Sequence, residues 1–141
     1  MDDVLTISEN ARSVNLELLS ELNFIKDIKV QDGQTFHAEN SCLIDLASKT
    51  LVYGCQNSVI PDDGSVKAIG EFAFYKCKRL KEIVIPETVN YIGWGAFRHC
   101  KDLNEIKYTG SMEQWKKIIK EPYWYCTSIK QVICNDGMVN L

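Results

Sequence analysis

Apolar positions in the middle of the chain recur at one fixed spacing. The stretch from Val66 to Ile83 returns as Val89 to Ile106, so each anchor reappears 23 residues further on. A repeat of this length predicts a stacked solenoid, because a single unit is too small to bury its own apolar face. The eight recurring pairs are Val66/Val89, Ile69/Ile92, Gly70/Gly93, Ala73/Ala96, Phe74/Phe97, Cys77/Cys100, Leu80/Leu103 and Ile83/Ile106.

The chain before these repeats predicts a cap and a hairpin. Residues 1–12 are polar and lack a period, so we expect a loose N-terminus. Residues 13–30 are expected to form an N-terminal cap and the first strand. Apolar spacings of three and four indicate a short capping helix there, and Ile28 alternates with Val30 as in a half-buried strand. Two β-prone runs around a polar turn predict a hairpin repeat at 41–61.

The two regular repeats span residues 62–108, and a C-terminal cap is expected at 109–141. Its helix should begin at Ser111, which forms a capping box with Gln114, and Pro122 prevents its continuation. A partial third repeat follows the helix, and Asp136 with Gly137 then predicts a turn back along the edge of the stack.

Composition narrows the function without identifying it. The chain has 141 residues and a formal net charge of −3, which gives no electrostatic reason to expect a nucleic-acid partner. No apolar run approaches the ~20 residues that a membrane span requires. The acidic start lacks the order of a signal peptide. We therefore expect either a protein kept inside a cell or a fragment of a longer secreted one.

The residues that could carry chemistry favour no reaction centre. The chain has six cysteines, and none forms a Cys-x-x-Cys pair. The shared repeat position of Cys77 and Cys100 favours buried, stacked thiols over a disulfide framework. His99 adjoins Cys100, but neighbours on a coil point in different directions, which disfavours a metal site or a nucleophile pair. His37 is the other histidine. We predict no catalytic residue, no metal and no cofactor.

The repeat motif resembles that of the BspA-like leucine-rich repeat family. The family pattern Ile-Gly-x-x-Ala-Phe-x-x-Cys-x-x-Leu-x-x-Ile-x-Ile-Pro is matched at 69–86 and less completely at 92–108, where 107–109 departs from it. The resemblance implies an α/β repeat fold for a single domain at 13–141. This fold is a short curved right-handed solenoid with a small parallel β-ladder, an inserted β-hairpin, and N- and C-terminal capping helices.

The same resemblance implies a function in recognition. Family members are mostly surface proteins of bacteria or protists that are thought to bind other proteins, and the family has no catalytic residues to transfer. We therefore predict a non-catalytic protein-interaction module of a bacterial surface or adhesion type. Two alternatives stay open: an intracellular inhibitor or anti-defence protein that blocks a host enzyme, and a structural spacer cut from a larger surface protein. The location would be cytoplasmic if Met1 is the native start. Oligomeric state is left open.

Outward positions of the predicted ladder are the candidate partner-binding residues. They are Asp27, Lys29, Glu82, Val84, Glu105, Lys107, Gln131 and Ile133. An ordinary solvated sheet face is the competing interpretation. Trp94 is a further candidate, since it stands at a position that is not an anchor of the repeat and tryptophan is enriched at binding hot spots. The run 123–125, Tyr-Trp-Tyr, is expected to seal the end of the core.

Overall fold

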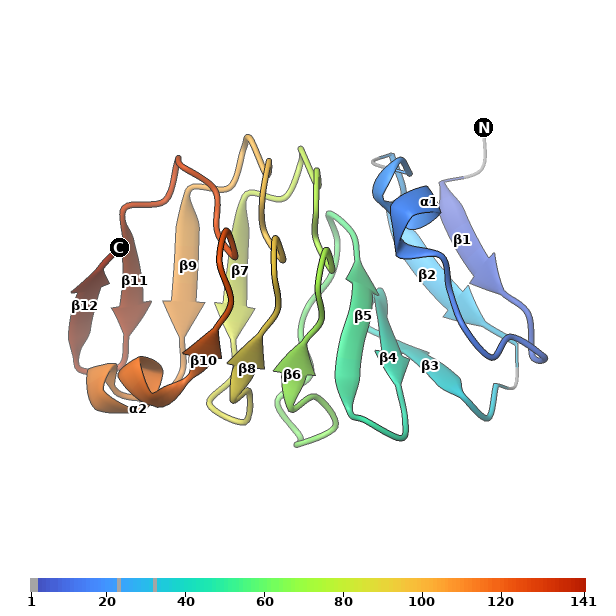
Figure 1. Ribbon diagram of the computed structural model, residues 1–141, viewed down its shortest axis with the longest axis horizontal. Helices are drawn as coiled ribbons and strands as arrows, with labels where there is room; N and C mark the ends of the chain where they lie inside the picture. The colour runs from blue at the N-terminus through green and yellow to red at the C-terminus, as the bar shows by residue number, and fades with distance from the viewer. Residues whose placement is uncertain (1–2, 23, 32) are drawn as a thin grey trace.

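The computed structural model describes residues 3–22, 24–31 and 33–141. Within these residues the chain is built mostly of strands, which stack side by side along one long axis (Figure 1). The elements are β1 (Val4–Ile7), α1 (Leu16–Ser20), β2 (Asp27–Val30), β3 (Phe36–Glu39), β4 (Cys42–Asp45), β5 (Thr50–Gly54), β6 (Ala68–Ile69), β7 (Glu82–Ile85), β8 (Tyr91–Ile92), β9 (Glu105–Tyr108), α2 (Met112–Lys117), β10 (Ile119–Lys120), β11 (Gln131–Cys134) and β12 (Gly137–Asn140).

The 23-residue repeat forms one coil of a β-solenoid. Each coil contributes a two-residue strand to one sheet and a four-residue strand to another, so β6, β8 and β10 pair in parallel, as do β7, β9 and β11. The register follows the sequence repeat, since Ile69 pairs with Ile92 and Ile83 pairs with Ile106. The predicted solenoid and its parallel ladder are confirmed.

The predicted hairpin, formed by β4 and β5, extends the sheet that contains the two-residue strands β6, β8 and β10. Strands β4 and β5 are antiparallel around the turn after Asp45, and β3 pairs with the other side of β4. The parallel pairing of Thr50 with Ala68 then joins β5 to β6. The six-stranded sheet therefore runs in the order β10-β8-β6-β5-β4-β3, and the hairpin occupies the place of a coil.

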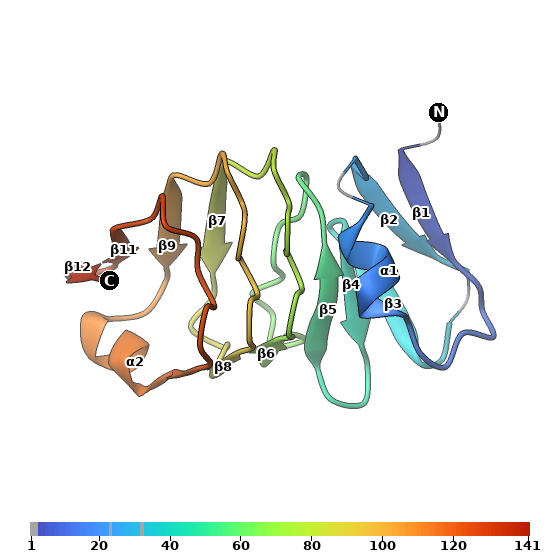
Figure 2. The same ribbon diagram turned by 45° about the horizontal axis from the view of Figure 1, so that its top comes forward.

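The N-terminal region differs from its prediction. Residues 4–7 form β1, which pairs in parallel with β2, so the expected loose terminus is wrong for this segment. The two strands share a small apolar cluster with the hairpin, in which Phe36, Leu43 and Tyr53 are buried. The Tyr53 hydroxyl donates to the Leu22 carbonyl oxygen at 3.0 Å and ties this cluster to the segment after α1. Figure 2 shows α1 together with β1 and β2 at the N-terminal end of the stack.

The α/β class and the two capping helices are not confirmed. In the part of the chain that the structure describes, α1 and α2 have only five and six residues beside twelve strands, because the coils turn their corners without helical segments. The predicted capping box of Ser111 and Gln114 is present at the start of α2. The last strand of the stack is nevertheless covered by β12, which returns antiparallel to β11 after Asp136 as the turn signal predicted.

A column of rings fills the interior of the regular coils. Phe74 and Phe97 are 1% and 0% exposed and stack with their ring centres 5.0 Å apart. Trp124 continues this column with its ring centre 6.4 Å from that of Phe97. Coil spacing depends on glycine as well: a Cβ on Gly93 would lie 2.5 Å from the backbone nitrogen of Glu71. Only glycine therefore lets these two coils approach so closely.

Candidate functional site

Six of the predicted site residues lie together on the outward face of the four-stranded sheet, whose order is β12-β11-β9-β7. We call this surface the sheet face, and it consists of Glu82, Val84, Glu105, Lys107, Gln131 and Ile133. Two rows cross it. Glu82 stands beside Glu105 in the first row, and Val84 stands beside Lys107 in the second. The second row continues through Ile133, which pairs with Lys107.

The sheet face is wider than the sequence predicted. Met138 on β12 pairs with Ile133 and is 57% exposed, while Val84 at the other edge is 42% exposed. An apolar row, interrupted by Lys107, therefore runs parallel to the acidic row. The Lys107 amine lies 3.8 Å from the Glu105 carboxylate. Sequence analysis predicted the return after Asp136 but not the register of β12 against β11, which places Met138 beside Ile133.

Two predicted site residues lie elsewhere. Asp27 and Lys29 are on β2, whose sheet partner is β1, so the expectation that they share the ladder of the regular coils is wrong. The Asp27 carboxylate accepts hydrogen bonds from the Ser41 hydroxyl and the Ile28 amide, both at 2.8 Å. These two bonds hold the pKa of Asp27 below its ordinary value. The separation arises because β2 packs against the antiparallel strands β3 and β4, which together with β5 stand between it and the regular coils.

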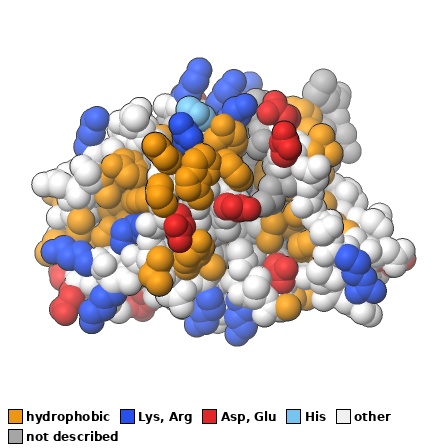
Figure 3. All heavy atoms as spheres, viewed as in Figure 1, with side chains coloured by type: hydrophobic (Ala, Val, Ile, Leu, Met, Phe, Trp, Pro, Cys, Tyr) orange, Lys and Arg blue, Asp and Glu red, His pale blue; other side chains and the backbone are white. Residues whose placement is uncertain are grey.

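Trp94 belongs to a row of rings on a different face. We call Phe72, Tyr75, Trp94 and Tyr123 the aromatic cluster. Their rings meet edge to face, with centres 5.0 Å apart for Phe72 and Tyr75, 5.1 Å for Phe72 and Trp94, and 5.6 Å for Trp94 and Tyr123. Tyr123 is 61% exposed. In Figure 3, hydrophobic side chains gather over the coil segments that follow β6, β8 and β10, on the side nearest the viewer.

In the run Tyr123-Trp124-Tyr125, one residue packs in the core and another points to the surface. Trp124 is 6% exposed and packs in the core, as the prediction for this run required. Tyr123 points outward instead, and the Arg98 guanidinium lies over its ring, 4.7 Å from the centre. The same guanidinium is 5.4 Å from the centre of the Trp94 ring. Sequence analysis did not select Arg98, since it depends on coil-to-coil stacking for its position.

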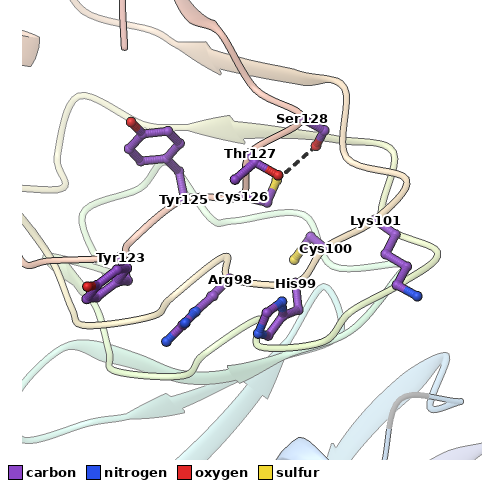
Figure 4. Close-up of a pocket in the computed structure, with 9 residues that line it drawn as sticks. All are labelled: Arg98, His99, Cys100, Lys101, Tyr123, Tyr125, Cys126, Thr127 and Ser128. Atoms are coloured by element: carbon purple, nitrogen blue, oxygen red, sulfur yellow. Dashed lines mark hydrogen bonds between the residues drawn. The ribbon is translucent and has the colours of Figure 1, made fainter.

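A hollow of about 510 Å³ opens beside this cluster (Figure 4). Arg98 and Tyr123 lie along one side of it, and Cys126 and Ser128 lie on the other, with the Cys126 sulfur 3.1 Å from the Ser128 hydroxyl. The Ser128 hydroxyl also lies within hydrogen-bond distance of the Leu103 carbonyl, to which it donates at 2.7 Å. The residues that line the hollow are Arg98, His99, Cys100, Lys101, Tyr123, Tyr125, Cys126, Thr127 and Ser128.

The cysteines belong to the interior. All six are buried free thiols, and Cys77 and Cys100 stand at equivalent positions of successive coils. Burial raises the pKa of the Cys42 and Cys77 thiols to about 12. The Cys100 thiol donates a hydrogen bond to the Phe74 carbonyl at 3.0 Å, and burial also raises its pKa. A thiol held protonated in this way is a poor nucleophile, so its exposed neighbour His99 does not form an activated pair with it.

The described residues offer no group of three or more His, Cys, Asp or Glu side chains that could hold a metal ion. Within the same part of the chain, each helix is too short and too polar to cross a bilayer.

The repeat geometry agrees with a family comparison. The model of the BspA type leucine-rich repeat region, which spans six copies of the repeat, matches residues 48–141. The chain belongs to this family. The BspA-type match begins in the hairpin, just before β5, and continues through both regular coils to the end of β12. None of the curated proteins matches the sequence.

Solved bacterial structures share the BspA-type fold. A leucine-rich repeat protein of Bacteroides capillosus is 16% identical with a TM-score of 0.51, over 72% of this chain and 99% of that one. One from Eubacterium ventriosum is 19% identical with a TM-score of 0.56, over 94% and 42%. A leucine-rich cell surface protein of Faecalibacterium prausnitzii is 15% identical with a TM-score of 0.52, over 83% and 50%. The chain thus spans half or less of the last two proteins.

Proposed function

We propose that this BspA-type domain is a non-catalytic module that binds a protein partner through the sheet face. Family membership supports a role in interaction, because stacked repeats present extended surfaces for binding. A location at a bacterial cell surface is part of the proposal. Its support is the Faecalibacterium prausnitzii structure, whose protein is described as a leucine-rich cell surface protein.

The two rows of the sheet face carry the proposal. Glu82 and Glu105 stand side by side on adjacent strands, an arrangement of like charges that lowers the stability of a sheet. Lys107 offsets part of this repulsion through its contact with Glu105. A basic side chain of a partner placed between the two carboxylates would relieve the rest. The stability of the sheet therefore gives no reason for Glu82 and Glu105 to stand side by side, whereas binding of a basic partner would.

The apolar row completes the surface. Val84 and Met138 are exposed at the two edges of the sheet, and Ile133 lies half-buried between them. A partner that covered this row would remove apolar surface from water, the main favourable term in most protein association. The expected partner therefore presents a basic group beside an apolar one.

A pull-down with a charge-reversed sheet face tests the proposal. The bait proteins are the wild type, the Glu82→Lys/Glu105→Lys variant and a control, Asp62→Lys/Glu113→Lys, which makes the same charge change at two exposed residues outside the sheet. Bacterial-surface, host-matrix and cytosolic extracts serve as prey, and bound proteins are identified by mass spectrometry. Each captured protein is then purified and titrated.

We expect a partner that the wild type and the control bind and the sheet variant loses, with affinity reduced about thirtyfold or more, as for a hot spot of ~2 kcal/mol. A partner that binds all three baits equally would contradict use of the sheet face. A cytosolic enzyme that loses activity on binding would instead support the inhibitor alternative.

A further inference from the structure

The aromatic cluster lies on the coil segments that precede the long strands, a surface separate from the sheet face. Its four rings meet edge to face, since the ring planes are 77° apart for Phe72 and Tyr75, 69° for Phe72 and Trp94, and 66° for Trp94 and Tyr123. Rings tilted against one another in this way form an uneven surface rather than a flat one. Such a surface fits side chains of a peptide better than the flat face of a sugar ring.

The backbone under the cluster is in an unfavourable conformation. Phe72 and Tyr123 have φ values of +56° and +58°, in the left-handed region where bulky residues are rare. Between them in the stack, Gly95 has φ +62°. Hydrogen bonds show the equivalence: Phe72 N–H donates to the Trp94 carbonyl, and Gly95 N–H donates to the Pro122 carbonyl. Two of three successive coils therefore place an aromatic residue where glycine is the favourable choice.

The middle coil supplies space for the rings. A Cβ on Gly95 would lie 3.2 Å from the Phe72 ring, so the glycine lets that ring lie over the coil next to Trp94. Left-handed residues are a regular feature of these coils, since Lys76 and His99 also adopt the conformation, but the energetic cost is larger for bulky aromatic residues and such costs are typical of functional sites. The outer rings are not needed to fill the core, because Phe74, Phe97 and Trp124 already fill it.

Positive charge borders the cluster on one side. Figure 3 shows Lys and Arg side chains along the upper edge of the hydrophobic patch, with acidic side chains to its upper right and lower down. The turns after the cluster carry the basic residues Lys76, Lys78, Arg79, Arg98 and Lys101, together with the acidic Asp102. Lys76 pairs with Glu21 at 3.4 Å, whereas Arg98, Lys78 and Lys101 have no ion pair with another described residue.

The hollow connects the rings to this charge. Tyr123 and Arg98 line it from one end, and Lys101 stands at its rim (Figure 4). A second hollow of about 370 Å³ lies between Lys78, Lys101, His99 and the pair of Glu21 with Lys76. An extended ligand could therefore place an apolar group at the rings and negative groups along the basic turns.

We infer that the aromatic cluster is a second binding site, which takes a short acidic segment of another protein. An aromatic or large aliphatic side chain of that segment packs against Trp94 and Tyr123. Its carboxylates pair with Arg98 and Lys101, where the guanidinium is already held in place by two rings. This inference goes beyond the proposed function, since it concerns a different face and a partner of opposite charge.

Defined peptides test the inference. The probes are fluorescein-labelled 12-residue peptides: one rich in Asp and Glu with a central Trp, the same peptide with Ala in place of Trp, and a third with Lys in place of the acids. Binding to the full chain is measured by fluorescence anisotropy. We expect the first peptide to bind at least tenfold more tightly than either of the others, and added salt to weaken it.

Variants locate the site. Trp94→Ala and Tyr123→Ala should each weaken the first peptide at least tenfold, and Arg98→Met, which keeps an apolar stem over the rings, about threefold or more. Phe24→Ala, at another partly exposed aromatic residue, is the matched control and should bind as the wild type does. If Trp94→Ala fails to fold, Tyr123→Ala still tests the inference, because Tyr123 is exposed and its truncation should leave the fold intact.

Other outcomes overturn the inference. One is equal binding of all three peptides, and another is binding that survives Tyr123→Ala. Tighter binding of a heparin hexasaccharide, lost in the same variants, would assign the site to an anionic glycan. Concentration-dependent self-association in analytical ultracentrifugation that Tyr123→Ala abolishes would assign it to a second copy of the chain. The Glu82→Lys/Glu105→Lys variant should still bind the acidic peptide, so failure of the sheet-face proposal is distinguishable from failure here.

Discussion

Aromatic residues one to three positions apart on the same coil segment have different surroundings. The inner column lies in the core, and the outer row lies at the surface. The inner members are Phe74, Phe97 and Trp124, each at most 6% exposed, and the outer members are Phe72, Trp94 and Tyr123. The pairs are Phe72 with Phe74, Trp94 with Phe97, and Tyr123 with Trp124, so one short turn segment of each coil supplies both sets.

The difference shows how a repeat protein separates stability from recognition. The inner rings stand at anchor positions, which recur because each coil must bury the face of the next. The outer rings stand at positions that vary between copies, such as Phe72 against Gly95. The left-handed backbone of Phe72 and Tyr123 lowers stability, while the ring contacts of these residues raise it. We expect the inner column to determine unfolding and the outer row to determine binding.

Loss of an inner ring should have the largest effect. Phe97→Ala removes a ring that is 0% exposed and packed between Phe74 and Trp124. We expect the free energy of unfolding to fall by ~3–5 kcal/mol, as for large truncations that leave a cavity. Urea titration followed by circular dichroism measures it, with Phe24→Ala as control. We expect the same loss for Phe74→Ala. An unchanged urea midpoint for Phe97→Ala would contradict the placement of Phe97 in the core.

Coil spacing should be the next most sensitive feature. Gly93→Ala forces a Cβ to within 2.5 Å of the Glu71 backbone, so the coils must move apart. We expect a loss of about 1–3 kcal/mol, in the range of overpacked cores. Gly70→Ala is the control, because its Cβ would meet Leu51 only at 3.1 Å. Equal stability of the two variants would contradict the account of coil spacing.

The interior thiols should make stability depend on alkaline pH. The unfolded thiol has a pKa near 9.0, and the buried Cys42 and Cys77 thiols have pKa values of about 12. Above pH 9 the unfolded chain releases protons that the folded chain keeps, so the free energy of unfolding falls as pH rises from 9 towards 12. The loss is on the order of 1 kcal/mol per thiol at pH 10. Urea titrations of the wild type and Cys77→Ala at pH 8 and pH 10 measure the loss, and the variant should lose less. The same loss in both proteins would contradict the assignment.

Loss of one outer ring should have a smaller effect on stability. Trp94→Ala removes two edge-to-face contacts and one cation–π contact at a half-buried position. We expect a fall of about 1–2 kcal/mol in the free energy of unfolding. Thermal melting monitored by circular dichroism measures it, and Phe97→Ala provides the reference. A loss as large as that of Phe97→Ala would place Trp94 in the core.

The smallest effect is expected at Tyr123. Asparagine tolerates the left-handed conformation, so Tyr123→Asn relieves the backbone at φ +58° while it removes a ring that is 61% exposed. The two changes oppose each other, and we expect stability within ~0.5 kcal/mol of the wild type. Tyr123→Val is the contrasting variant, since a β-branched residue cannot relieve that conformation and should be less stable. Equal melting of the two variants would contradict a strained backbone.

More of the coil structure than of the binding surfaces could be predicted from the sequence. Anchors such as Ile69 and Ile92 recur at 23 residues and therefore predicted both the register and the core. The strand β1 was missed because residues 4–7 pair with a segment that carries no repeat. Asp27 was misplaced for a related reason: its alternation predicts a strand, and only tertiary structure decides which sheet it joins.

The aromatic cluster was only partly accessible from sequence. Trp94 was selected because it departs from the repeat. Phe72 gave a weaker signal of the same kind, as an aromatic residue opposite Gly95. Tyr123 comes into register with Gly95 only through the longer third coil, where Gly95 N–H donates to the Pro122 carbonyl. Since the insertion that contains α2 shifts the spacing there, no fixed period links Tyr123 to the other rings.

One comparison of unfolding free energies tests the separation of the two sets most directly. It sets Phe97→Ala, which removes one inner ring, beside Trp94→Ala/Tyr123→Ala, which removes two outer rings, in urea titrations under the same conditions. The account predicts that the single inner substitution lowers the free energy of unfolding more than the double outer substitution does. A double variant that loses as much as Phe97→Ala, or more, would show that the outer rings hold the fold and contradict their assignment to binding.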